Sequence, residues 1–570
     1  MKRYSVDFEA TTNALYEQEG LVRVWAWQIR DIDSLVVAAQ GNTIETFMDW
    51  TTSLKESVNY YIHNLKYDGN FIIDYLLRNG WEHLDDEEQP REKTFETLIT
   101  NMGAYFSITI NLAVYSTRTV RITIYDSAKK LPMSLERIAH AFKLPILKGD
   151  IDYHKFRSID HVMDAEEQKY MDADTEILAR ALGIQFNSGL EKMTIASDAL
   201  NHFKSTIATG KGKVDNQFEY LYPKLPREMD DYIRASYKGG FVYLKPEYSG
   251  AAFDRTTSYD VNSLYPSVMY NNILPFGVPQ AFEGQGVADN RFPLFIQRLE
   301  VSFSLKKGYL PTIQAKGNMR FVPTEYLHSS EGEIIELYLT NIDLEMFLEH
   351  HDIHYLEYIG GLKFRGVKDQ FKTYIDHWSH IKETSEGGKR ELAKLMLNSL
   401  YGKFATKLEK VRKIPYLCEL TDKVRFNYSD EVIGDPVYTA MSSFITAYAR
   451  KITIGAAQDN YDTFIYADTD SIHLIGHDVP GNLDIHDSTL GKWGHEGNFG
   501  KSKFLRAKTY IKENEKGDLL VTCAGLPDDA RSQISFDNFK IGAVYEGKLS
   551  TNVVKGGSLL RPSQFSIMGW

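Results

Sequence analysis

The chain is poor in cysteine, in long apolar runs and in positive charge. Only two of its 570 residues are cysteine, Cys418 and Cys523. This argues against a disulfide framework and a cysteine-ligated zinc site, and it fits a reducing cytoplasm. No apolar run approaches membrane-spanning length, and the N-terminus enters a strand-like pattern without a signal peptide. We therefore expect a cytoplasmic protein with no membrane partner.

The formal net charge of −12 at pH 7 counts against a nucleic-acid binder for the chain as a whole. Local distribution matters more than this sum. Basic residues outnumber acidic ones between residues 382 and 413, and residues 500–512 contain basic residues and no acidic one. This pattern is compatible with a channel for a polyanion. The length of the chain predicts two or more domains.

A pair of acidic residues interrupts two apolar runs near the C-terminal end. Asp468 and Asp470 flank Thr469 between Thr463–Ile465 and Ile472–Ile475. In an extended strand the two carboxylates point to one face, where they are costly unless a cation meets them. A hard divalent cation would do so. The alternative is a polar hairpin turn, because Asp and Ser favour turns.

A second group of acids is spread over the first third of the chain. Asp7 and Glu9 alternate on one strand face, Asp68 opens a helical pattern, and Tyr170 and Asp174 share a helix face four residues apart. Any one of these acids alone is more often a solvated surface residue. Together, four carboxylates without cysteine are an inventory for two Mg²⁺ or Mn²⁺ ions. Such a pair can support phosphodiester hydrolysis, with the Tyr170 hydroxyl orienting water.

These motifs, in this order, resemble those of a known family. Asp-x-Glu, Asn-Leu-x-Tyr-Asp and Tyr-x-x-x-Asp are similar to three proofreading exonuclease motifs. Residues 260–266, 394–402 and 466–471 are similar to polymerase motifs A, B and C. Order and spacing resemble the protein-primed family B DNA polymerases of the phi-twenty-nine group of bacteriophages, over nearly the whole chain.

The resemblance implies an α/β and α+β multidomain fold. A ribonuclease H-like 3′–5′ exonuclease domain would cover 1–195, and a right-hand polymerase with palm, fingers and thumb would cover 196–570. Within the latter it implies palm at about 196–271 and 407–523, a first insertion at about 272–369, fingers at about 370–406, a second insertion at about 408–431 and thumb at about 524–570.

In the exonuclease half, the resemblance implies catalytic roles for the acids and Tyr170, with Lys148 assisting. Metal ligands would be Asp7, Glu9, Asp174 and, more loosely, Asp150. Contacts to the DNA strand would come from Tyr61, His63, Asn64, Tyr67 and Ser127. Ala10 stands where the family commonly has Thr, so weaker proofreading is expected.

In the polymerase half, the resemblance implies that Asp260 and Asp468 are the principal metal ligands. Val261 would add a carbonyl, and Asp470 would ligate or steer the nucleotide-bound metal. Tyr265 would pack under the incoming sugar. A helical stripe of Arg390, Lys394, Asn398 and Tyr401, together with Lys382, would bind the nucleotide. DNA contacts are assigned to Tyr237, Gly239, Gly240, Ser263, Thr446, Arg450, and to Lys508 and Tyr510 on one strand face.

The implied activity is DNA-directed DNA synthesis from a primer 3′-hydroxyl, with proofreading, strand displacement and protein-primed initiation. The implied cofactors are two Mg²⁺ ions per active site, with Mn²⁺ as a substitute. The implied partners are template and primer DNA, dNTPs and a terminal protein, for a monomer or a heterodimer with that protein in the host bacterium's cytoplasm. A non-catalytic DNA-binding protein and a nuclease with a DNA-binding C-terminal half remain the alternatives.

Overall fold

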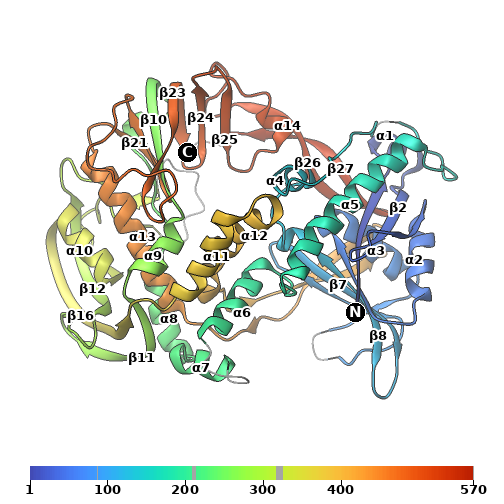
Figure 1. Ribbon diagram of the computed structural model, residues 1–570, viewed down its shortest axis with the longest axis horizontal. Coiled ribbons are helices and arrows are strands. Elements are labelled where there is room, and N and C mark those ends of the chain that lie inside the picture. Colours follow the sequence, from blue (N-terminus) through green and yellow to red (C-terminus); the bar gives the residue numbers. More distant parts are fainter. Residues whose placement is uncertain (86–87, 154, 208–213, 316–324, 569–570) are drawn as a thin grey trace.

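The computed structural model describes residues 1–85, 88–153, 155–207, 214–315 and 325–568. An N-terminal half and a C-terminal half are each built on a large sheet of their own (Figure 1). Residues 316–324 of the predicted first insertion and the last two of the predicted thumb lie outside the described residues. Within the described part, no helix has the length and apolar character needed to cross a membrane.

The N-terminal half contains an eight-stranded mixed sheet in the order β3-β2-β1-β4-β8-β7-β6-β5. Its strands are β1 (Lys2–Ala10), β2 (Val24–Asp31), β3 (Val37–Gly41), β4 (Val58–Ile62), β5 (Glu82–His83), β6 (Thr94–Ile99), β7 (Tyr105–Val114) and β8 (Thr119–Asp126). Its helices are α1 (Asn13–Glu19), α2 (Ile44–Ser53), α3 (Leu65–Arg78), α4 (Leu135–Ala141) and α5 (Ala165–Asn187).

Strand β1 presents two different faces to the helices around it. Tyr4, Val6 and Phe8 share one apolar core with residues of α2 and α3. The alternate residues face α5, where the Ser5 hydroxyl donates to the Thr175 carbonyl at 2.8 Å. Because side chains alternate along a strand, Asp7 and Glu9 emerge on the α5 side.

The C-terminal half contains a seven-stranded antiparallel sheet in the order β25-β24-β23-β10-β22-β21-β9. Its strands are β9 (Val242–Leu244), β10 (Ala252–Val261), β21 (Phe464–Asp468), β22 (Ser471–Ile475), β23 (Trp493–Arg506), β24 (Thr509–Asn514) and β25 (Leu519–Cys523). Helices α9 (Leu264–Asn271) and α13 (Thr439–Asp459) contribute to its core.

Two further groups of helices belong to the C-terminal half, and members of both stand between the large sheets (Figure 1). The first is α6 (Ile195–Ile207), α7 (Val214–Leu221) and α8 (Arg227–Ser236); the second is the pair α11 (Lys372–Thr384) and α12 (Gly387–Ser399). Helix α12 ends at Ser399 and a 3₁₀ turn, Tyr401–Ala405, follows. The predicted helical stripe is therefore wrong at its last member, because Tyr401 lies beyond the helix.

The predicted first insertion forms a four-stranded sheet in the order β11-β16-β12-β15, covered by one helix. The elements are β11 (Leu274–Glu283), β12 (Leu294–Leu305), β15 (Ile335–Thr340), α10 (Asn341–His350) and β16 (His351–Val367), with a short ladder of β13 (Ile313–Gln314) and β14 (Tyr326–Leu327). Arg450 of α13 joins α10 to the large sheet's core through a buried ion pair with Asp343.

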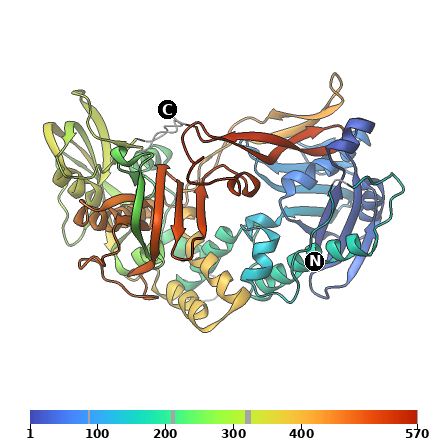
Figure 2. The same cartoon turned by 90° about the horizontal axis from the view of Figure 1, so that it is seen from above.

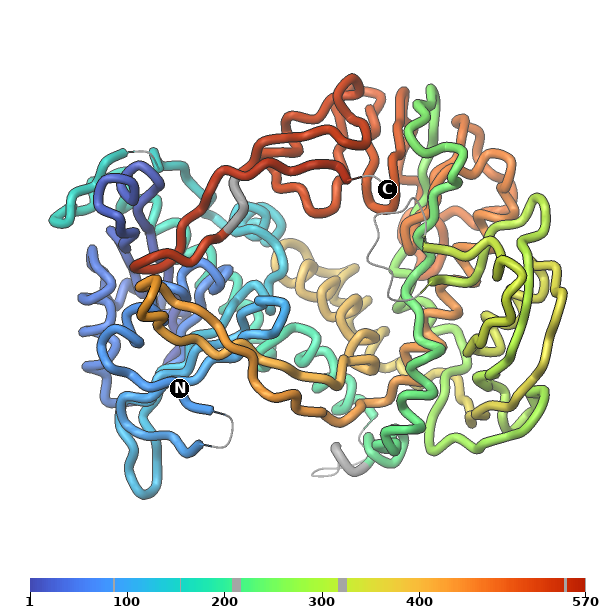
Figure 3. Tube along the Cα trace, turned by 180° about the vertical axis from the view of Figure 1, so that it is seen from behind, coloured from blue at the N-terminus to red at the C-terminus, as the bar shows by residue number. Residues whose placement is uncertain are grey.

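Two hairpins reach back from the C-terminal half to α3. One is β18 (Lys413–Cys418) and β19 (Lys423–Tyr428), beside the short pair β17 (Glu409–Lys410) and β20 (Val432–Ile433); the other is β26 (Val544–Val554) and β27 (Gly557–Ser566), after α14 (Asp528–Arg531). Both lie side by side against the N-terminal half (Figure 3), and the second spans the space between the sheets from above (Figure 2). Val424, Val554 and Leu559 belong to the apolar core of that half.

Candidate active sites

Three carboxylates meet on the α5 side of β1. Ligand atoms of Asp7, Glu9 and Asp174 lie within 4.8 Å of one another, which could hold a metal ion. Asp68 is buried at the start of α3, close enough for its charge to act on that of Glu9. The sequence placed these four acids on three segments, and the fold brings the segments together.

The electrostatics of this cluster favour a cation. Burial and the neighbouring Asp174 raise the pKa of Asp7 to about 7. Burial, followed by Asp7 and Asp174, raises the pKa of Glu9 well above its ordinary value. One oxygen of Asp174, Oδ1, is buried without a hydrogen-bond partner. Like charges held together in this way are costly unless a positive group joins them, so the donor set fits a hard divalent ion.

Lys148 supplies part of the compensating charge. Its Nζ atom lies 2.5 Å from Asp174 Oδ2 and over the ring of Tyr170 at 5.0 Å from the centroid. The Tyr170 hydroxyl is 2.7 Å from the hydroxyl of Tyr153, a residue that the sequence did not single out. Asp150 is exposed and accepts from the backbone N–H of Ile151, so its predicted place among the metal ligands is not seen in this arrangement.

The residues predicted to contact the DNA strand are accessible in some cases and buried in others. Asn64 is exposed and Tyr67 is half-buried. His63 bonds Ser127 and the Met133 carbonyl through its two ring nitrogens. Tyr61 and Ser127 are buried, the latter donating to the Ile62 carbonyl. Both side chains are covered in this arrangement, and their contact with a DNA strand stays a prediction.

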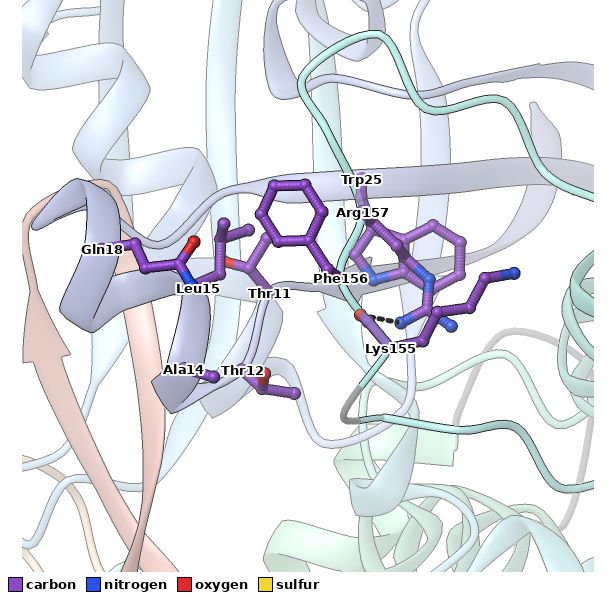
Figure 4. A pocket seen from close by; sticks show the side chains of 9 residues that line it. All are labelled: Thr11, Thr12, Ala14, Leu15, Gln18, Trp25, Lys155, Phe156 and Arg157. Atoms are coloured by element: carbon purple, nitrogen blue, oxygen red, sulfur yellow. Dashed lines mark hydrogen bonds between the residues drawn. The ribbon is translucent and has the colours of Figure 1, made fainter.

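A cavity of about 190 Å³ opens between the loop after β1 and the loop before α5 (Figure 4). Figure 4 shows Phe156 beside Trp25 and Arg157, and the Arg157 guanidinium lies over the Trp25 ring, 4.0 Å from its centroid. Arg157 is paired with Glu167, and Lys155 with Asp164 and Glu167. Both cations that line the cavity are therefore already paired with carboxylates.

A second acidic cluster lies at the centre of the C-terminal sheet. Asp260 nears the end of β10, opposite Ser471 of β22. The two-residue turn between β21 and β22 has Thr469 at φ +64°. The Val261 N–H donates to the Asp470 carbonyl at 2.8 Å, which joins the two segments. The two interpretations of this stretch, a hairpin turn and a metal site, are therefore compatible, because Asp468 and Asp470 both lie at the turn of the β21–β22 hairpin.

The two acids of the turn, Asp468 and Asp470, have different electrostatic partners, which the sequence did not predict. Burial, then Asp470 and Glu496, raise the pKa of Asp260 to about 8, and burial is the main cause that raises the pKa of Asp470 to about 6. Asp468 instead accepts from Lys508 Nζ at 2.6 Å and from the Tyr466 hydroxyl at 3.2 Å. In this arrangement the charge of Asp470, and not that of Asp468, is among the causes that raise the pKa of Asp260. The pairing of Asp260 with Asp468 as metal ligands stays a prediction.

Glu496 is a functional candidate that the sequence did not reveal. Its charge raises the pKa of both Asp260 and Asp470, and its carboxylate accepts a hydrogen bond of 2.9 Å from the Ser258 hydroxyl. In the ladder, Ser258 pairs with Gly497 and Tyr259 with His495, so Glu496 is the extra residue of a β-bulge. Bulges re-aim a side chain next to active sites, and no motif spacing announces one.

The predicted strand face of Lys508 and Tyr510 is wrong at Lys508. Lys508 lies in the turn between β23 and β24 with φ +54°, and only Tyr510 is in a strand. The Lys508 backbone N–H donates to the Tyr466 hydroxyl at 2.8 Å. The turn aims its ammonium group at Asp468, so the lysine faces the acidic cluster for a reason other than strand alternation.

The predicted nucleotide-binding residues gather beside this cluster. The rings of Tyr265 and Tyr401 stack with centroids 3.9 Å apart. Lys382 Nζ donates to the Ser263 hydroxyl at 3.1 Å. Along α12, Arg390 bonds the Lys382 carbonyl, Lys394 pairs with Glu391, and Asn398 is exposed. Burial, then Arg390 and Lys394, lower the pKa of Lys382, as expected where cations converge without an anion.

The segment before β9 packs against the same centre. A Cβ atom on Gly240 would lie 2.7 Å from Thr469 Cγ2 and 3.1 Å from the Tyr265 hydroxyl, so glycine is required for this approach. Gly239 is exposed and Tyr237 half-buried, which leaves both accessible to DNA as predicted contacts.

Thr446 and Arg450 are buried in α13. Thr446 donates to the Ser442 carbonyl, and Arg450 to Asp343 and to the carbonyls of Lys238 and Gly239. Arg450 thus holds the segment that contains Gly239, and the DNA contacts of Thr446 and Arg450 stay a prediction.

The chain is similar to polymerases throughout its length. The family model described as DNA polymerase type B, organellar and viral, matches residues 51–164 and 150–487. The DNA polymerases of Bacillus phage phi29 and Streptococcus phage Cp-1 are 43% and 35% identical to it, over 99% of this chain and 99% and 98% of theirs. The structure of the Phi29 enzyme complexed with primer-template DNA and incoming nucleotide substrates matches with TM-score 0.91 and 42% identity, covering 99% of this chain and 100% of that one.

Proposed function

The chain belongs to the type B DNA polymerases of the phi29 group of phages, and from that premise we propose that it replicates DNA with two separate metal-dependent centres. One centre, with Asp260 and Asp470, extends a primer 3′-hydroxyl with dNTPs. The other, with Asp7, Glu9 and Asp174, removes mismatched nucleotides in the 3′–5′ direction. The support for this division is a group of three carboxylates at β1 and α5 that could hold a metal ion, together with separate acids on the C-terminal sheet, where the charges of Asp470 and Glu496 raise the pKa of Asp260.

Divalent cations, with Mg²⁺ as the expected ion and two per centre, fit both donor sets. Asp7, Glu9 and Asp174 would hold them in the first centre, and Asp260, Asp470 and the Val261 carbonyl in the second. When bound, they would supply an activated oxygen nucleophile and stabilise the leaving oxygen. Without that charge, both clusters hold acids with raised pKa values, which is the cost that a cation removes.

The side chains around each centre have separate tasks. Lys148 holds Asp174 in place, and the hydroxyl pair of Tyr153 and Tyr170 can orient a water toward the scissile phosphate. In the polymerase centre, the stacked rings of Tyr265 and Tyr401 form a floor on which a deoxyribose and base can rest. Lys382, Arg390 and Lys394 can meet triphosphate oxygens, for which Lys acts as a point charge.

The test is primer extension and mismatch removal with Mg²⁺ and dNTPs. We expect Asp470→Ala to abolish extension and to spare degradation of a mismatched primer, and Asp7→Ala to do the reverse. Asp150→Ala is the matched control and should leave both activities unchanged, because Asp150 stands outside the cluster. Loss of both activities in both variants would refute separate centres, and a nuclease without synthesis would show no extension in any variant.

We also propose that synthesis starts on a terminal protein, whose Ser, Thr or Tyr hydroxyl takes the place of the primer end. The support is the family membership and the two insertions, residues 272–369 and 408–431. Incubation with a candidate terminal protein and labelled dATP should give a covalent nucleotidyl product. Its absence with the partner encoded beside this polymerase would count against the proposal.

A further inference from the structure

Lys512 of β24 is a buried lysine on the seven-stranded sheet. The residue is 7% exposed, and its Nζ atom lies 4.1 Å from the centroid of the Phe499 ring. It belongs to the basic stretch 500–512, but its ammonium group is covered. Burial lowers the pKa of Lys512, and the charge of Glu496 opposes that shift. A buried charge is costly unless its neighbours compensate it, so the neighbours of this lysine indicate its task.

The ammonium group reaches Ser258 of β10 across the intervening strand β23. Lys512 Nζ lies 3.4 Å from Ser258 Oγ, and the strands follow in the order β24-β23-β10. Tyr259 and Val261 belong to the apolar core that contains residues of α9 and α13. Because side chains alternate along a strand, Ser258 and Asp260 emerge on the opposite face. Lys512 thus brings a positive charge to the face that presents Asp260.

Ser258 passes the effect of Lys512 on to Glu496. The Ser258 hydroxyl donates to Glu496 Oε2 at 2.9 Å. An ammonium group only donates, and a hydroxyl has one hydrogen. Ser258 therefore accepts from Lys512 and keeps its single hydrogen for Glu496. Glu496 itself is exposed, and its charge raises the pKa of Asp260 and Asp470, so the direction of its carboxylate bears on the polymerase centre.

His473 faces Ser258 from β22 and adds no positive charge. The two residues are paired in the ladder between β10 and β22. Burial, and then the charge of Lys512, lower the pKa of His473 well below its ordinary value, so its imidazole is neutral. The positive charge beside Ser258 therefore comes from Lys512.

We infer that Lys512 is a positioning residue for DNA synthesis, which through the Ser258 hydroxyl holds the Glu496 carboxylate beside Asp260 and Asp470. The inference rests on the proposed polymerase function. It assigns a covered lysine an effect on the reaction that needs no contact with DNA or nucleotide. If the lysine served the stability of the sheet alone, its removal would have the same effect with and without Glu496.

The first test is Lys512→Met in the full chain, assayed by single-nucleotide primer extension over a range of dNTP concentrations. We expect kcat to fall by about 10- to 100-fold, the range typical of hydrogen-bond partners that orient groups at a metal site. The dNTP KM should change little, because the predicted nucleotide contacts lie on other elements. Ser258→Ala should lose about as much, and the double variant no more than either. In a Glu496→Gln background, Lys512→Met should cause no further loss.

The second test measures the contact without activity, as the Tm in EDTA. The change in Tm caused by Lys512→Met should be more destabilising in the chain with Glu496 than in the Glu496→Gln background, since only the former loses an attractive charge pair. Lys516→Met is the matched control, because Lys516 is exposed in the turn after β24. It should leave primer extension and the Tm at the wild-type level.

Four results would overturn the inference. They are an unchanged kcat in Lys512→Met, additive losses with Ser258→Ala, a full further loss in the Glu496→Gln background, and equal Tm changes in both backgrounds. Degradation of single-stranded DNA should stay at the wild-type level in Lys512→Met, and an equal loss of synthesis and degradation would also contradict the inference. If the wild-type chain fails to extend primers, the proposed function fails, and the Tm comparison still tests the link between Lys512 and Glu496.

Discussion

The buried ion pair between Arg450 and Asp343 allows a quantitative test of how the first insertion is attached. The Arg450 side chain is 2% exposed and donates to both oxygens of Asp343 at 2.8–3.0 Å. It also donates to the carbonyls of Lys238 and Gly239. Removal of one partner strands a buried charge, which costs about 3–5 kcal/mol, whereas apolar replacement of both partners is often close to neutral.

We therefore expect Asp343→Leu and Arg450→Met each to lower the free energy of unfolding by about 3–5 kcal/mol. The double variant should lose less than the sum of the two, with a coupling of at least about 1–3 kcal/mol. Urea titrations followed by tryptophan fluorescence and circular dichroism measure all three. Losses below about 1 kcal/mol in both single variants, or strict additivity in the double variant, would refute the reasoning.

Three further outcomes follow from the two carboxylate clusters. Lys148→Met should slow removal of a mismatched primer end about 10- to 100-fold, the range found when a group that orients metal ligands is lost, and should leave primer extension unchanged in the same reactions. Because Asp260 and Asp470 have pKa values of about 8 and about 6 without metal, protons compete with the cation below about pH 8. The Mg²⁺ concentration for half-maximal extension should therefore rise as pH falls from 8 to 6, and a constant value would contradict this. The raised pKa of Asp7 means that the folded chain binds its proton more tightly than the unfolded chain. Stability in EDTA is then present at low pH and is lost as pH rises from about 4 to about 7. Thermal unfolding of Asp7→Asn should show a smaller decline than the wild-type chain, since Glu9 and Asp68 also have raised pKa values and keep part of it.

Strand periodicity was enough to predict that Asp7 and Glu9 share one face of β1. Asp7 and Glu9 alternate with Val6 and Phe8, and a central strand with one apolar face must send its acids to the other. The helix spacing of Tyr170 and Asp174 gave the second segment in the same way. The sequence did not predict the contact between Tyr153 and Tyr170, because Tyr153 lies in a loop and no local pattern specifies the course of that loop.

The polymerase cluster was predicted less accurately, because its details depend on irregular backbone. Glu496 points to Asp260 and Asp470 only because a bulge adds one residue to β23. Lys508 resembled a strand residue, since Lys-Thr-Tyr alternates, yet it adopts φ +54° without the Gly or Asn that usually marks such a turn.

Arg450 shows a different limit. The family resemblance assigned it as a DNA contact, and its partner Asp343 is 107 residues away in the sequence. A long-range buried pair leaves no periodic signal, because each residue alone looks like an ordinary surface charge. Because α13 is buried at this point, the Arg450 side chain bonds Asp343 and backbone carbonyls of the protein.

The two halves are held together at three separate places, and this bears on how one DNA end reaches two centres. Lys130 of the N-terminal half lies 2.5 Å from Asp198 of α6, with both side chains buried. Gly387 and Gly388 at the start of α12 lie against Phe142 and Ile184 of the N-terminal half. Asp422 pairs with Arg78 of α3 and with Lys555 of the β26–β27 hairpin. A large rotation between the halves would break a buried pair, at about 3–5 kcal/mol, and expose the apolar core that both hairpins share with α3. If the two proposed centres act on one DNA end, movement of that end with the two halves fixed costs none of these contacts, so we propose it as the route between the centres.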